Sequence, residues 1–258
     1  MTTFVLVPGA CHGGWWYAPV VEALAAQGHH AVAVTPSGLD PDTVPAPGDD
    51  AGPPISLETH LGETVAAVDT AAQADAGPLV LVGHSYGGML ITAAADRRPE
   101  AITALVYLDA FVPEDGDTCF ATTDDAGRAW YVDGARRSGL AVDPLPFFDG
   151  RARPHPIGTL LQAVRLTGAW RAVPVRHFVL CTGVPGRSAF ADVAQKVRAE
   201  PDWTVHTWQT RHNVLHDGPA RVLDLLHTVA TQAADAASTT PGRSGRPAPP
   251  RADPHRPG

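Results

Sequence analysis

The feature that most constrains this chain is an apolar strand that breaks into the motif Gly-x-Ser-x-Gly. Residues 79–82 are all apolar, Gly83-His84-Ser85-Tyr86-Gly87-Gly88 follows at once, and residues 89–95 form helix readily. The two motif glycines lack the Cβ atoms that would clash in a sharp strand-to-helix turn, so the serine can be held in a strained conformation with its hydroxyl exposed. The motif alone is weak, but this strand–turn–helix context predicts a nucleophile at Ser85.

Short apolar runs alternate with helical patterns along most of the chain. Runs that are apolar on both faces predict strands buried between helices, and hence a mostly parallel sheet. The run at 203–208 alternates more, which is typical of an edge strand. The pattern predicts an α/β fold with βαβ crossovers and six core strands, the other five being at 4–7, 31–34, 79–82, 104–108 and 177–180.

Two helices between these strands carry boundary signals. Leucines and valines recur at helical spacing over 57–68 behind Ser56, which predicts Ser56 as the N-cap. The helical pattern over 20–27 stops at Gly28, a residue type that commonly ends helices.

Residues 112–172 interrupt the alternation with five prolines and several aromatic residues, and we interpret them as a cap inserted between two core strands. The core is then 1–111 and 173–233. The aromatic residues either pack the cap's own small core or line the mouth of a pocket. Residues 234–258 are rich in Pro, Gly, Ser, Thr and Arg and are predicted to be a disordered tail.

Composition restricts the partners. The formal charge is −8 and Lys196 is the one lysine, which argues against a nucleic acid or an anionic membrane as partner. The three cysteines are widely spaced and show neither a disulfide nor a metal-ligand pattern, and the first strand begins too early for a leader. We expect a cytoplasmic protein that acts on a small molecule without metal or cofactor; its oligomeric state stays open.

A nucleophilic serine needs a base to take its proton. In an α/β enzyme of this kind the base comes from the loop after the last strand, and His212 lies there, just behind residues 203–208. His216 is the competing candidate, but it lies four residues nearer the last helix. His84, within the motif, is expected to support the turn.

A second glycine-rich turn, at residues 7–14, follows the first strand. Its glycines would let the backbone approach the reacting centre, so the amides of Ala10 and Tyr86 could together bind an oxyanion. The alternative is an ordinary glycine-rich turn. Cys11 and His12 are interpreted as packing or loop-fixing residues.

Residues 5–15, 83–88, 107–113 and the His212 segment together resemble the α/β-hydrolase superfamily. Within it they most resemble the branch of plant hydroxynitrile lyases and methyl esterases with their bacterial relatives, over about residues 3 to 230. The resemblance implies a six-stranded, mostly parallel sheet flanked by helices, with an inserted cap. Hydroxynitrile lyases of the branch carry a lysine and a threonine where this chain has Asn213 and Gly9, so an esterase-like activity is favoured.

The family usually carries the acid that orients the histidine in the loop after the next-to-last strand, here residues 181–187. That loop has no carboxylate, and Val184 stands about where the acid belongs. Asp109 is the best replacement, since haloalkane dehalogenases similarly carry an acid at the end of the matching strand. Alternatively Asp109 fixes the local chain and the serine and histidine work as a dyad. Asp217 is expected to bind amides at the start of the last helix.

Three functions follow from these residues. The first is a serine hydrolase for a small carboxylic ester, lactone or thioester, with Ser85, His212 and Asp109 as catalytic residues. The second is a lyase, cyclase or dehydratase acting on a polyketide-like or aromatic metabolite in the same pocket. The third is a non-catalytic binding protein on a hydrolase scaffold, which the displaced acid leaves open.

Overall fold

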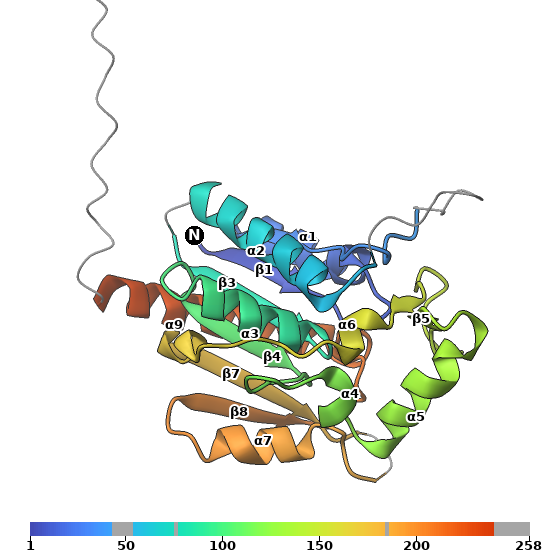
Figure 1. Cartoon of the computed structure of the whole chain (residues 1–258). Helices are drawn as coiled ribbons and strands as arrows, with labels where there is room; N and C mark the ends of the chain where they lie inside the picture. Colours follow the sequence, from blue (N-terminus) through green and yellow to red (C-terminus); the bar gives the residue numbers. More distant parts are fainter. Residues whose placement is uncertain (43–53, 75–76, 184–185, 240–258) are drawn as a thin grey trace, which may run out of the picture.

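Six parallel strands form the central sheet in the computed structural model, which describes residues 1–42, 54–74, 77–183 and 186–239 (Figure 1). The strand order is β2-β1-β3-β4-β7-β8, so both predicted fold class and strand number are confirmed. The strands are β1 (Thr3–Val7), β2 (His30–Ala33), β3 (Leu79–His84), β4 (Ala104–Leu108), β7 (Val175–Cys181) and β8 (Trp203–Trp208).

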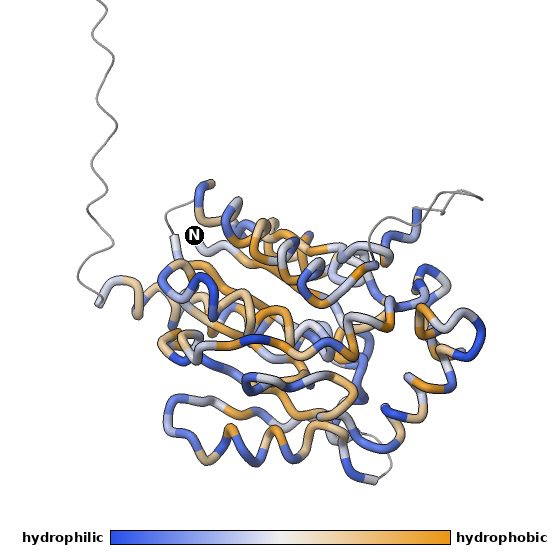
Figure 2. The backbone as a smooth tube through the Cα atoms, in the orientation of Figure 1, coloured by the Kyte–Doolittle hydropathy of each residue, from blue (hydrophilic) through white to orange (hydrophobic). Residues whose placement is uncertain are grey.

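Helices cover both faces of this sheet because its strands are apolar on both sides. In β1, Phe4 and Leu6 pack on one face with α1 (Ala18–Ala26) and α9 (Pro219–Thr239). Val5 and Val7 pack on the other face, which is covered by α2 (Leu57–Ala74), α3 (Gly87–Arg97) and α7 (Ala191–Arg198). Figure 2 shows the hydrophobic residues concentrated along the central strands between these layers.

Both sheet edges are partly exposed. β8 is an edge strand, as predicted from its alternation. The expectation that the run at 31–34 is buried on both faces is wrong, because β2 is the other edge strand and Val32 is 50% exposed. An edge strand has a neighbouring strand on one side only, so fewer residues surround its side chains than in the middle of the sheet.

The predicted helix boundaries are confirmed. The Ser56 hydroxyl accepts a hydrogen bond from the Thr59 amide at 3.3 Å, which satisfies one of the free amides at the start of α2. Gly28 has φ +79° just after α1, a conformation that favours glycine.

Residues 112–172, called the insertion below, lie between β4 and β7 and contain short elements. Figure 1 shows α4, α5, β5 and α6 beyond the carboxyl ends of the strands. The end of the insertion instead runs back along α3, where Asp96 accepts the amides of Thr167 at 2.6 Å and Trp170 at 3.2 Å. The elements are α4 (Cys119–Thr122), α5 (Asp125–Gly134), η2 (Ala135–Arg137), β5 (Ala141–Val142), β6 (His155–Pro156), α6 (Gly158–Leu161) and η3 (Ala169–Ala172).

The remaining elements are η1 (Gly14–Tyr17), before α1, and α8 (Val214–Asp217), before α9. Residues 234–239 are helical, so the prediction of a tail from 234 is wrong there: α9 continues to Thr239, because alanines sustain a helix that is already packed at Ala233. The rest of that predicted tail, 240–258, lies outside the described residues. Across the described ranges, no helix is long and apolar enough to cross a membrane.

Candidate active site

The turn between β3 and α3 holds Ser85 in a strained conformation. Its φ is +52°, in the left-handed region that residues with a Cβ rarely adopt. A Cβ on Gly87 would lie 2.4 Å from the Val7 carbonyl oxygen, and one on Gly83 would lie 2.8 Å from the Gly87 carbonyl. Both motif glycines are therefore required by close packing, and the serine lies where the sequence predicted it.

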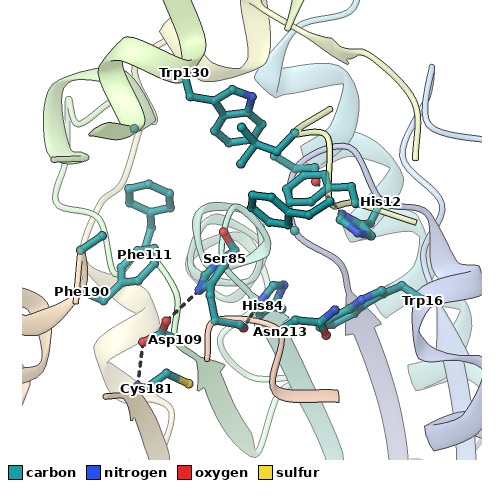
Figure 3. Close-up of a pocket in the computed structure, with 18 of the residues that line it drawn as sticks. His12, Trp16, His84, Ser85, Asp109, Phe111, Trp130, Cys181, Phe190 and Asn213 are labelled. Carbon is teal, nitrogen blue, oxygen red and sulfur yellow. Dashed lines mark hydrogen bonds and ion pairs between the residues drawn. The ribbon is translucent and has the colours of Figure 1, made fainter. Parts of the chain in front are cut away.

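Asp109 directly follows β4, and its carboxylate binds His212. One oxygen, Oδ2, accepts a hydrogen bond from His212 Nδ1 at 2.7 Å, and the other, Oδ1, accepts the Cys181 amide at 2.9 Å (Figure 3). Asp109 is 2% exposed and has φ +47°. Since an ionised carboxylate only accepts, His212 carries its proton on Nδ1 and leaves the Nε2 lone pair free.

The strand order explains how the acid reaches the histidine. β4 pairs with β7 in the sheet, and Leu108 lies opposite Val179. The carboxyl ends of the two strands are therefore neighbours, and the amide that holds Asp109 belongs to Cys181, the last residue of β7. Val184, where the family's acid was expected, lies outside the described residues.

His84 fixes the backbone of the His212 loop. Its Nε2 donates to the His212 carbonyl oxygen at 2.9 Å, and its ring stacks on Trp16 with centroids 4.4 Å apart. Burial lowers the pKa of His84 well below its usual range, so the ring is neutral. The expectation that His84 is a supporting residue is consistent with this contact, which reaches beyond its own turn.

The other end of the loop is anchored by Asp217. Its carboxylate accepts the Arg211 amide at 2.9 Å and pairs with the Arg211 guanidinium and with His216. The predicted contact with amides at the start of the last helix is wrong, because the carboxylate turns back toward the residue before His212. The side chain of His216 is 71% exposed and Asp217 holds it outside the site.

The glycine-rich turn after β1 lies beside Ser85. Ala10 and Ser85 line the same cavity, and Cys11 has φ +67°. His12 Nδ1 donates to the Ala10 carbonyl at 2.7 Å, which is the loop-fixing contact expected of it. Neither the Ala10 nor the Tyr86 amide donates to a protein acceptor within the described residues.

A cavity of about 610 Å³ opens above the serine. Figure 3 shows Ser85 between Trp130, from the insertion, and Asp109, at the carboxyl end of β4. Phe190 stacks on the His212 ring with centroids 5.6 Å apart, and sequence reasoning missed it because only its place after the 181–187 loop pointed to it. The apolar lining is Trp15, Trp16, Phe111, Trp130, Tyr131, Leu145, Phe147, Phe148 and Phe190.

Of the two interpretations of the aromatic residues in the insertion, the pocket-lining one holds for four of them, whereas Trp170 fits neither because it packs against the central sheet. Trp130, Tyr131, Phe147 and Phe148 line the cavity. Trp170 is 1% exposed and packs near Trp203, so it belongs to the core.

The two arginines that line the cavity are each paired with a carboxylate. Arg151 binds Asp149 at 2.9 Å and lies 4.2 Å over the Trp15 ring. Arg187 binds Asp192 at 2.8 Å. Among the cavity residues that the structure describes, neither cation is left to attract a negatively charged ligand.

The structure offers no alternative nucleophile among its described cysteines. All three are buried and free, and burial raises the pKa of Cys181, which lines the cavity, to about 12. A thiol with such a pKa is protonated and weakly nucleophilic at neutral pH. No cluster of three potential metal ligands occurs within the described ranges.

Comparisons with known proteins agree with the fold. The carbendazim hydrolyzing esterase of Nocardioides sp. (strain SG-4G) is 32% identical over 247 residues, which cover 88% of this chain and 98% of that protein. Esterase PIR7B of Oryza sativa subsp. japonica is 37% identical over 159 residues, and this match spans only 56% of each chain. Among solved structures, an extracellular alpha/beta-hydrolase from a Paenibacillus species superimposes with a TM-score of 0.67 at 19% identity, covering 88% of this chain and 98% of that one.

The sequence model of the alpha/beta hydrolase family matches residues 4–225, which include Ser85, Asp109 and the His212 loop. The resemblance seen in the sequence is thus confirmed, and this chain belongs to the alpha/beta hydrolase family.

Proposed function

We propose that the protein is a serine hydrolase that cleaves small, uncharged carboxylic esters, with lactones and thioesters as related substrates, through an acyl-enzyme on Ser85. The hydrogen bond between Asp109 and His212 is the observation that carries the proposal. This hydrogen bond gives the histidine a carboxylate partner. The lack of a carboxylate in the usual loop was the reason for considering a non-catalytic binding protein. The relatives named as esterases support the same reaction class.

The reaction uses each group in turn. The Ser85 hydroxyl attacks the ester carbonyl while His212 Nε2 takes its proton, and Asp109 stabilises the imidazolium that forms. The amides of Ala10 and Tyr86 donate to the developing oxyanion. His212 then protonates the departing alcohol, and a water molecule, activated by the same imidazole, releases the acid and restores the serine.

The cavity supports an uncharged, partly aromatic substrate. Its size is within the usual range for small-molecule sites, and its walls include eight Trp, Tyr and Phe side chains. Because Arg151 and Arg187 are already paired with carboxylates, a free acid would gain little from binding there. The insertion would act as a cap, since it contributes Trp130 and Phe148 to the lining of the cavity.

Replacing the serine tests the proposal directly. The variant Ser85→Ala should lose hydrolysis of p-nitrophenyl acetate and should no longer be labelled by a fluorophosphonate, which forms a covalent bond with an activated serine. Ser138→Ala is the matched control, since this exposed serine only makes local hydrogen bonds within the insertion. Full activity in Ser85→Ala would refute the serine mechanism.

A further inference from the structure

We propose that His155 is a positioning residue that holds the oxyanion-binding turn in its active shape. The inference rests on the proposed function and extends it to a residue of the insertion that makes no contact with the cavity. His155 comes from β6, far along the chain from the turn it contacts, and is completely buried.

The insertion holds the turn by hydrogen bonds at Cys11, two of which are made by the Cys11 backbone. The Cys11 amide donates to His155 Nδ1 at 3.1 Å, and the Cys11 carbonyl accepts the Arg153 amide at 2.9 Å. Cys11 has φ +67°, a strained conformation that needs support from its surroundings. Ala10, whose amide is the proposed oxyanion donor, is the preceding residue, so any relaxation at Cys11 moves that donor.

The His155 ring is locked in the one tautomer that can accept from Cys11. Its Nε2 lies 2.8 Å from Thr159 Oγ1, and the Thr159 hydroxyl donates to the Pro156 carbonyl at 2.8 Å. The hydroxyl proton is thus committed, so Nε2–H donates and Nδ1 carries the lone pair. Burial lowers the pKa of His155 well below its usual range, which keeps the ring neutral.

The same ring also packs against the residue that carries the second donor. Tyr86 lies edge-on to His155 with centroids 4.6 Å apart. The Tyr86 hydroxyl donates to His60 Nδ1 at 3.0 Å, since His60 Nε2 donates to the Ser37 carbonyl at 2.9 Å. One buried imidazole therefore contacts Tyr86, which would carry one oxyanion donor, and Cys11, which directly follows Ala10, the other.

The test compares His155→Leu with His155→Asn. Leucine removes the acceptor, whereas the asparagine side-chain oxygen can stand near the position of Nδ1 and accept from Cys11. With p-nitrophenyl acetate, His155→Leu should lower kcat by roughly 10- to 100-fold with little change in KM, because a displaced donor is lost mainly to the transition state. The affinity for a trifluoromethyl ketone, which forms an oxyanion on the serine, should fall by a similar factor. His155→Asn should recover most of both losses.

The inference would be overturned if His155→Leu kept the kcat and the ketone affinity of the parent. It would also be overturned if His155→Leu and His155→Asn lost kcat equally while both kept the ketone affinity of the parent. If His155→Leu does not fold, Thr159→Val replaces it. This variant removes the oxygen that accepts from His155 Nε2–H, so the ring can change tautomer and lose its hydrogen bond with the Cys11 amide. The kcat should then fall in the same way. Ser85→Ala is measured in parallel. Its inactivity beside a fully active His155→Leu refutes only the role of His155, whereas an active Ser85→Ala refutes the proposed function itself.

Discussion

Replacing Asp109 with asparagine should remove most of the catalytic rate without unfolding the protein. The two carboxylate oxygens accept from the Cys181 amide at 2.9 Å and from His212 Nδ1 at 2.7 Å. Asparagine has one oxygen and one NH₂ group, so it cannot accept at both places. The Cys181 amide is fixed in the sheet and can only donate, so the asparagine oxygen stays there and its NH₂ group faces His212.

That orientation forces the wrong tautomer on the histidine. Nδ1 must then accept, the ring proton moves to Nε2, and the side that faces the serine no longer has a lone pair. Replacing a triad acid by its amide lowers kcat by roughly 10⁴-fold when the geometry is otherwise kept. We expect a loss of this order in Asp109→Asn, which corresponds to about 5.5 kcal/mol of transition-state stabilisation.

The test measures kcat for p-nitrophenyl acetate hydrolysis and the thermal unfolding midpoint of the same variant. Asp96→Asn is the matched control, because Asp96 is also buried and also accepts backbone amides, from Thr167 and Trp170, but lies away from the cavity. The control should lose stability and keep kcat. A folded Asp109→Asn with a kcat within about threefold of the parent would refute the triad and leave a serine–histidine dyad.

Two further predictions concern folding. Gly87→Ala should unfold at markedly lower temperature or fail to fold, since its Cβ would lie 2.4 Å from the Val7 carbonyl oxygen; a thermal midpoint equal to the parent's would contradict the packing argument. Acid should destabilise the protein below about pH 6.5, because burial lowers the pKa of His60, His84 and His155 in the folded state only. The unfolded chain then binds more protons than the folded one, so the free energy of unfolding should fall by up to roughly 1.4 kcal/mol per histidine and pH unit. A urea midpoint that is unchanged between pH 7.5 and 5.5 would exclude this loss of stability.

Features that depend on neighbours in the chain could be predicted from the sequence. The turn around Ser85 needs glycines at fixed offsets, and the buried strands need runs that are apolar on both faces, so local patterns suffice for both. The same holds for the Ser56 cap and the helix end at Gly28. The edge position of β2 is different, because an edge is defined by which strands pair and no local pattern encodes that.

Contacts between distant segments could not be predicted in this way. His155 meets Cys11 across 144 residues, and its Pro-His-Pro surroundings indicate only a loop. Phe190 reaches the His212 ring because of where α7 begins after β7. Both residues are placed by tertiary packing, for which a single sequence carries no periodic signal.

Asp109 lies between these two cases, and it shows what the chemistry requires of an acid. The imidazole needs a carboxylate oxygen within hydrogen-bond distance of Nδ1, and the segment that carries the oxygen is immaterial. In a parallel sheet, adjacent strands end at the same edge, so an acid after β4 and one in the loop after β7 can reach the same place. The end of β4 has an added advantage, since the Cys181 amide holds one oxygen and thereby aims the other at His212. A carboxylate anchored in this way by the sheet itself keeps its orientation without help from the loop after β7.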